Sequence, residues 1–132
     1  MSTSIASTQV AQHADNSTLL NAFLTDITAI RTVLAGILTG STTWDVGSLV
    51  DAAGESKDVT VTGAVLGDFA IASLGVDTVD MLVTATVTAA DTVTVRVQNE
   101  SGSTVDLAST TVRVVVLPFA SFAAPSALTV TA

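Results

Sequence analysis

A regular repeat of large apolar side chains between residues 16 and 39 constrains the fold of this chain more than any other feature. These side chains recur at alternating spacings of three and four residues, which is the heptad pattern of a coiled-coil helix. The repeat consists of Leu20, Phe23, Ile27, Ile30, Leu34 and Ile37. Counted from Leu20, its members alternate between heptad positions a and d, and isoleucine at d favours three or four strands over two. The pattern predicts an amphipathic helix over residues 15–40 that forms a trimeric coiled coil.

Charged and capping residues agree with this helix. Asp26 falls at heptad position g and Arg31 at the following e, so Asp26 of one helix can reach Arg31 of a parallel neighbour. Residues 15–17 (Asp, Asn, Ser) supply N-caps, and Gly40 follows the last apolar residue as a stop signal. We expect these eight side chains, the six apolar ones with Asp26 and Arg31, to form an oligomer interface.

The same helix has a second interpretation, in which it covers the sheet of its own chain. Four further apolar residues widen the stripe beyond a coiled-coil seam: Leu19, Leu24, Val33 and Leu38. The repeat also covers little more than three heptads, close to the minimum for assigning a coiled coil. The sequence therefore leaves both interpretations open.

Composition bounds the class of protein. The chain has 132 residues and is 48% hydrophobic, which is enough for one domain with a real core plus appendages. Twelve acidic residues against four basic ones give a net charge of −8. We expect no nucleic-acid binding, because phosphate contact needs clustered Lys or Arg. The chain has no cysteine, so it can form neither a disulfide nor a thiolate metal site.

Residues 1–14 are small and polar and are expected to be a flexible leader. They lack the basic residues and apolar run of a signal peptide. We expect no membrane span either, because Asn21, Asp26 and Arg31 interrupt the apolar stretch from residue 19 to residue 38. His13, the only histidine, has no second ligand or paired acid at a recognisable spacing, and we expect it to be solvated.

After Gly40 the apolar period changes to two, which indicates half-buried strands. The expected strands are Thr42–Val46, Lys57–Thr62, Phe69–Ser73, Met81–Thr88, Thr92–Gln98 and Thr111–Leu117, with a shorter seventh at Val105–Leu107. Residues typical of turns, mainly Gly, Asp and Asn, separate them. Many short strands at this spacing predict a mainly β domain over residues 41–117, an antiparallel β-sandwich or jelly roll preceded by the helix.

Two further segments carry apolar residues that a free monomer would expose. Val115 and Leu117 fall on the polar face of the last strand, where either a neighbouring subunit or burial within the monomer would explain them. Residues 118–132 contain two prolines, no charge and four large apolar side chains: Phe119, Phe122, Leu128 and Val130. We expect these residues to form an arm that lies on a neighbouring molecule. The alternative is an edge strand, residues 127–131, on the same domain.

No catalytic constellation is present in the sequence. It contains no Lys-bearing phosphate loop, no His paired with Ser or Cys, and no paired-histidine metal motif. The acids at turns and strand ends (Asp45, Asp51, Asp77, Asp80, Asp91 and Asp106) are expected to accept local backbone hydrogen bonds. Asp77 and Asp80 do not have the spacing of an EF-hand, and we predict no metal or cofactor. Trp44, the only tryptophan, is expected to anchor a core or an interface. We expect the protein not to be an enzyme.

Several of these turns and strands resemble a domain found in virion proteins of tailed bacteriophages. The shared motifs are Trp44 with Gly47 and Ser48, Thr60–Gly63, Leu66–Asp68, Ala89–Arg96, Asn99 with Gly102, and Val105–Ser109. The resemblance covers about residues 42–117 and departs from the pattern at Asp45 and Val46, where proline often follows the tryptophan. It implies a non-enzymatic, trimeric β-domain on a phage particle.

The small size of the chain favours one part of the particle. A fibre or tailspike would carry a long shaft or a large receptor domain, whereas this chain has one sandwich with appendages. We therefore expect a trimeric capsid decoration, or cement, protein on the outer surface of the head, bound to the major capsid protein. The alternative is a small head-fibre or tail-associated module that binds a host surface or glycan. The low aromatic content, 4%, disfavours that alternative.

Overall fold

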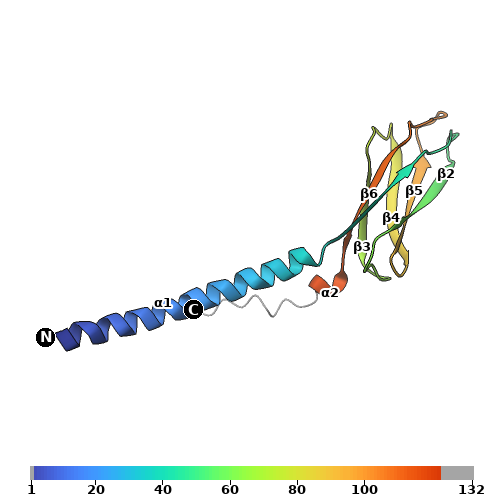
Figure 1. Ribbon diagram of the computed structural model, residues 1–132. Coiled ribbons are helices and arrows are strands. Elements are labelled where there is room, and N and C mark those ends of the chain that lie inside the picture. The colour runs from blue at the N-terminus through green and yellow to red at the C-terminus, as the bar shows by residue number, and fades with distance from the viewer. Residues whose placement is uncertain (1, 123–132) are drawn as a thin grey trace.

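A computed structural model describes residues 2–122 of the chain, and the side chains of residues 11–122. A long helix, α1 (Ser2–Ala35), leads away from a small β-sandwich (Figure 1). A short helix, α2 (Phe119–Phe122), follows the last strand and packs beside the end of α1. The predicted class, a mainly β antiparallel sandwich preceded by one helix, is confirmed.

The sandwich consists of two antiparallel sheets of three strands each. The first sheet has the order β1-β6-β3, with bounds β1 (Leu38–Trp44), β6 (Thr110–Leu117) and β3 (Phe69–Leu74). The second has the order β2-β5-β4, with bounds β2 (Gly54–Thr60), β5 (Thr92–Asn99) and β4 (Met81–Ala89). The six main strands are thus confirmed. The expected seventh strand is reduced to an isolated bridge between Leu49 and Val105.

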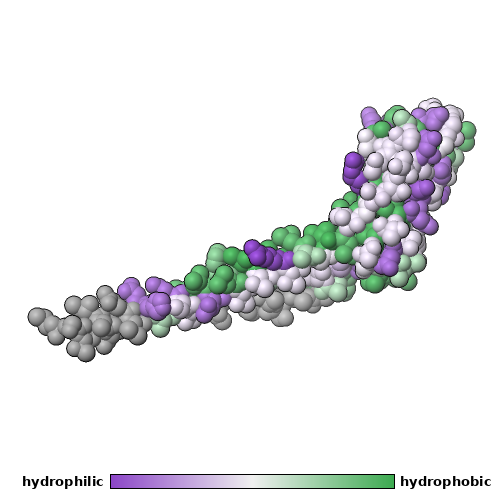
Figure 2. Space-filling model, viewed as in Figure 1, coloured by the Kyte–Doolittle hydropathy of each residue, from purple (hydrophilic) through white to green (hydrophobic). Residues whose placement is uncertain are grey.

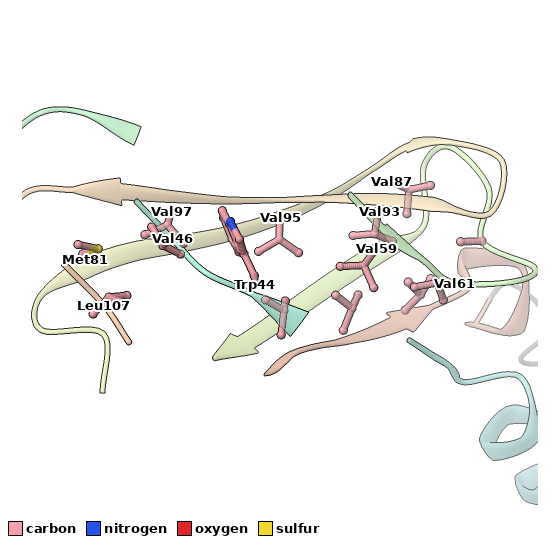
Figure 3. Packing of buried hydrophobic residues seen from close by; sticks show 14 of the residues in the cluster. Trp44, Val46, Val59, Val61, Met81, Val87, Val93, Val95, Val97 and Leu107 are labelled. Carbon is pink, nitrogen blue, oxygen red and sulfur yellow. The ribbon is translucent and has the colours of Figure 1, made fainter. Parts of the chain in front are cut away.

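Valine dominates the core between the two sheets. Its fully buried members are Val46, Val59, Val61, Val93, Val95, Val97, Val112, Val114 and Val116 (Figure 3). Along the central strand β5 the buried valines alternate with polar neighbours, and along β6 they alternate with Arg113, Val115 and Leu117, as the period of two requires. Trp44 at the end of β1 is also buried in this core, as expected for an anchor. The sandwich therefore buries a complete core without help from α1.

The helix differs from its predicted bounds at both ends. Residues 2–14, the expected flexible leader, belong to α1. This segment has neither Gly nor Pro and contains several Ala and Gln, which are good helix formers. Extending an existing helix adds one hydrogen bond per residue without a new nucleation step. The leader assignment was therefore wrong.

At its other end α1 stops at Ala35 rather than at Gly40. Gly36 donates its backbone N–H to Thr32 O (3.1 Å) and Val33 O (3.2 Å), which closes the last turn. From Leu38 onward the backbone pairs with β6, beginning opposite Val116. Backbone pairing with the long strand β6 stabilises an extended conformation here, and this outweighs the helical spacing of the apolar side chains. Ile37, assigned to the coiled-coil seam, consequently lies outside the helix.

Asn99 is the one buried polar side chain among the described residues, and it holds the far end of the sandwich together. Its Nδ2 donates to Leu49 O (2.8 Å) and Ser103 O (2.7 Å), and its Oδ1 accepts from Ser101 N (3.0 Å). We predict that Asn99→Ala lowers the free energy of unfolding by about 2–4 kcal/mol, because buried backbone groups lose their partners. Urea denaturation measures this loss. The exposed Asn16→Ala serves as a control that should change stability by less than about 0.5 kcal/mol.

The turn between β3 and β4 stores backbone strain. Val79 and Asp80 both have positive φ, 48° and 64°. A left-handed conformation costs roughly 1–2 kcal/mol for a residue with a Cβ, and Asn tolerates it better than Val. We predict that Val79→Asn raises the free energy of unfolding by about 1 kcal/mol in urea denaturation. Val50→Asn is the control, at another exposed valine (60%, against 49% for Val79) that lacks positive φ, and it should give no gain. An equal gain at both sites would show that polarity alone is responsible.

Candidate self-association surface

The heptad residues of α1 form an exposed apolar stripe. The exposed fractions are 56% for Leu20, 60% for Phe23, 49% for Ile30 and 60% for Leu34, and Ile27 is half-buried. We call these five residues the heptad stripe. Green, apolar side chains gather along one side of α1 in Figure 2. Large apolar side chains left contiguous on a surface usually mark an interaction site.

The structure decides between the two interpretations of the helix. If α1 covered its own sheet, the heptad stripe would be buried in the sandwich. Instead α1 leads away from it (Figure 1), and four of the five residues of the stripe are exposed. The interpretation in which the helix packs on its own sandwich is therefore wrong. A coiled coil between copies of the chain stays a prediction.

Asp26 and Arg31 lie beside the heptad stripe on the same helix. Asp26 is half-buried and Arg31 is exposed. They are five residues apart, which places them about 140° apart around the axis of one helix. Between parallel helices, by contrast, the g and e positions face each other. These two residues can therefore set the register of a parallel assembly.

A second apolar surface lies where α1 meets the sandwich. It consists of Phe69, Ile71, Val115, Phe119 and Phe122, all exposed, and we call it the neck patch. The rings of Phe69 and Phe119 are 6.5 Å apart at 57°, a tilted contact typical of aromatic pairs. The backbone N–H of Phe119 donates to Asp68 Oδ1 (3.1 Å), which fixes α2 to the start of β3. Figure 2 shows apolar surface at this junction as well as along α1.

The neck patch contains expected and unexpected residues. Phe119 and Phe122 were expected in an apolar arm, and they lie in α2. Leu128 and Val130, and the alternative edge strand at residues 127–131, lie outside the described residues. Val115 lies on the outer face of β6, the centre strand of its sheet, paired in register with Ile71.

Phe69 and Ile71 were not predicted as contact residues. The signal was present in β3, whose sequence FAIASL places Phe69 and Ile71 on one face and its two alanines, followed by Leu74, on the other. Ala70 and Ala72 are the inward, half-buried residues, so the large side chains point outward. This inverted size pattern is unusual for a strand that covers a core.

The acidic residues act mainly in structure. Asp77 accepts from Val79 N (3.0 Å), which is the local backbone bond predicted for acids at turns. Asp51 accepts from Gly102 N (3.0 Å) and Asp91 from Gly63 N (2.7 Å), so these two carboxylates join loops that are far apart in sequence. Within residues 2–122, no group of three or more His, Cys, Asp or Glu side chains is placed to hold a metal ion. His13 is exposed on α1.

One helical stretch, Ala11–Ala35, is long and apolar enough to cross a membrane by length and composition, and none of it is buried. A single stretch of this kind near the start of a chain is weak evidence for a span. It also contains Asp26 and Arg31, and charged side chains are costly at the centre of a bilayer. The absence of a membrane span stays a prediction.

Comparison with models of known protein families found no matching family, and comparison with curated proteins found no matching relative. Any function must therefore be inferred from the geometry. The described residues combine a β-sandwich that buries its own core with a protruding apolar helix and an apolar neck.

Proposed function

We propose that this chain is a structural protein of a tailed-bacteriophage particle, that it forms a trimer through α1, and that the trimer binds the outer surface of the head as a decoration protein. The observation that carries the proposal is the heptad stripe, exposed on a helix that stands apart from its sandwich. The phage particle as the location is supported only by the sequence motifs that resemble virion domains.

The trimer follows from burial energetics and register. Burying a large apolar side chain contributes roughly 1.5–3 kcal/mol, and each helix brings five such residues to the seam. Asp26 and Arg31 favour a parallel arrangement, which places all three sandwiches at the same end. The assembly consists of a three-helix coiled coil with three β-sandwiches, the heads, at one end.

The neck patch is the surface that we assign to the shell contact. Its five members are apolar, and the patch lies where the three heads of a parallel trimer would diverge. A major capsid protein with a matching apolar site would bind the trimer there. Binding to the assembled shell in preference to the free subunit stabilises the shell by mass action. The protein acts by contact area and carries out no chemistry.

A second candidate function is a head-fibre or tail-associated module that binds a host surface or glycan. The stalk-and-head shape supports it, since the sandwich lies at the end of a long helix (Figure 1). However, the only tryptophan is buried in the core and offers no stacking platform for a sugar. Binding of the purified protein to a glycan array, with no binding to heads, would favour this candidate.

The decisive experiment adds the purified protein to phage heads that lack it and locates it by electron microscopy. The proposal expects ordered, three-fold density on the outer surface of the head. Ile71→Ser should reduce occupancy at least about tenfold, since removing a buried isoleucine from a contact costs roughly 1.5–3 kcal/mol and each 1.4 kcal/mol is a factor of ten. Val50→Ser, at an exposed valine on the opposite end of the sandwich, is the matched control. Unchanged occupancy with Ile71→Ser would remove the neck patch from the shell contact.

A further inference from the structure

Strand β4 forms an unprotected edge of its sheet. It has nine residues, the most of the six described strands, and among these strands it pairs with β5 alone. Its sequence, MLVTATVTA, contains no charged residue and no proline. Edge strands usually carry such residues, because a free row of backbone N–H and C=O groups invites pairing with another chain. The opposite edge of the same sheet, β2, does carry charges, at Glu55, Lys57 and Asp58.

The hydrogen bonds of β5 show which backbone groups of β4 are free. Just before β5, Asp91 O accepts from Val61 N (2.9 Å), and at its end Asn99 O accepts from Ala52 N (2.8 Å). Both donors flank β2. Because the direction of these groups alternates along a strand, the odd-numbered residues of β5 bond toward β2 and the even-numbered residues bond toward β4.

Three residues in the middle of β4 therefore have backbone groups that point away from the sheet. In the register of β4 with β5, the even-numbered residues of β5 lie opposite residues 82, 84 and 86. The N–H and C=O groups of Val83, Ala85 and Val87 consequently point to the free side of β4. Among the described residues, no loop or other strand supplies a backbone hydrogen bond to them. The edge is open for another strand.

The central sequence of β4 reads the same in both directions. Residues 83–87 are Val, Thr, Ala, Thr and Val, so Ala85 is the centre of a palindrome. An antiparallel pair of β4 strands with a two-fold axis at Ala85 brings Thr84 of one copy opposite Thr86 of the other, and Val83 opposite Val87. Every residue then meets one of its own type, as a self-complementary two-fold contact requires.

We propose that two copies of this chain pair through the free edges of β4, antiparallel and centred on Ala85. The two three-stranded sheets become one sheet of six strands. The outward-pointing groups of residues 83, 85 and 87 in each copy form about six hydrogen bonds across the seam, two for each residue pair. The opposed threonines lie on the exposed outer face, where cross-strand threonine pairs stabilise a sheet.

This contact is separate from the coiled coil of α1. A two-fold axis cannot relate the three members of a three-fold trimer, so pairing at β4 links one trimer to the next. The trimer belongs to the proposed function, whereas the pairing itself depends only on β4.

Single cysteines test the register, because the chain has none of its own. Thr84→Cys and Thr86→Cys each place one thiol on the exposed face of β4. In the proposed register, residue 84 of one copy lies about 4.5 Å from residue 86 of the other between Cα atoms, a distance that a disulfide bridges. Two copies of the same residue lie on a diagonal of about 7–8 Å, which is too long. Mixed in equal amounts under mild oxidation, the two variants should cross-link at least about tenfold faster than either variant alone.

The matched control mixes Thr60→Cys with Thr62→Cys, two exposed threonines at the end of β2, on the other edge of the same sheet. Mixing should not accelerate cross-linking of this pair. Mass spectrometry of the unreduced, digested protein identifies the linked peptides, and Trp44 fluorescence with circular dichroism confirms that the variants are folded.

Each outcome decides the proposal. Faster cross-linking in the mixed β4 sample alone, through residues 84 and 86, supports it. Equal rates in the mixed and separate samples, or no cross-linking in any of them, would show that β4 does not pair with a second copy in this register. The disulfide reports on β4 alone, so its failure would leave the trimer of α1 and the proposed function to their own tests.

Discussion

We expect that replacing Phe23 by Asp converts the proposed trimer to a monomer. Phe23 is 60% exposed at a d position in the middle of the heptad stripe. The substitution removes a buried aromatic side chain and adds a charge from every helix. Losing about 2 kcal/mol of burial per copy amounts to about 6 kcal/mol over three copies, which lowers the association constant by about four powers of ten. Light scattering across a concentration series measures the change in mass.

The control for this prediction is Ala22→Asp, which adds the same charge one residue away, at an exposed c position outside the stripe. We expect this variant to leave the proposed trimer intact. Because the sandwich has its own core, both variants should retain the same thermal unfolding of the β-domain at equal monomer concentration. If the unsubstituted protein is a monomer at every accessible concentration, the heptad stripe has no role in self-association and the proposed function loses its main support.

Replacing Trp44 by Ala will remove a large part of the stability of the sandwich. Trp44 is buried at the end of β1, and its Nε1 donates to Glu55 Oε1 (3.1 Å). Glu55 Oε2 in turn accepts from Gly47 N (2.9 Å), so the indole supports the carboxylate that holds the following loop. A tryptophan-to-alanine change in a core costs about 3–5 kcal/mol, a large part of the 5–15 kcal/mol typical of a folded domain.

The midpoint of urea denaturation, followed by circular dichroism, measures this effect. Trp44→Phe is the matched variant, because it keeps an aromatic side chain in the core and loses the hydrogen bond to Glu55. It should cost roughly 1–3 kcal/mol, less than the alanine variant. A loss of under 1 kcal/mol for Trp44→Ala would mean that the tryptophan serves a surface contact and not the core.

The motif residues that resemble virion domains have structural roles in this chain. Trp44 is in the core, Asn99 bonds to three backbone groups, and Gly102 adopts φ 80° while donating to Asp51. Such residues specify turns and packing. The resemblance therefore rests on residues that shape the domain, and it carries no information about a partner.

Local pattern was sufficient for the strands and the apolar seam. The period of two in β4, β5 and β6 arises because one face of each strand is buried in the core. This period predicted the first and last residues of those strands almost to the residue. The heptad spacing likewise identified the stripe from Leu20 to Leu34. It could not show that the helix begins at Ser2, because small residues such as Ala, Ser and Thr carry no amphipathic period.

The amino-acid sequence by itself determined that the chain has one apolar helix and a valine-rich antiparallel sandwich, because both signals depend only on which neighbouring side chains share a face. Tertiary structure alone decided that the helix stands free of the sandwich and that Ile37 belongs to neither stripe nor core. It also decided that Phe69, Ile71 and Phe119 meet at the neck. The first two outcomes depend on strand pairing between Leu38–Trp44 and Thr110–Leu117, residues more than sixty positions apart, and the third depends on pairing between Phe69–Leu74 and the same strand. No local pattern encodes which distant strands pair or the direction in which that pairing orients the helix.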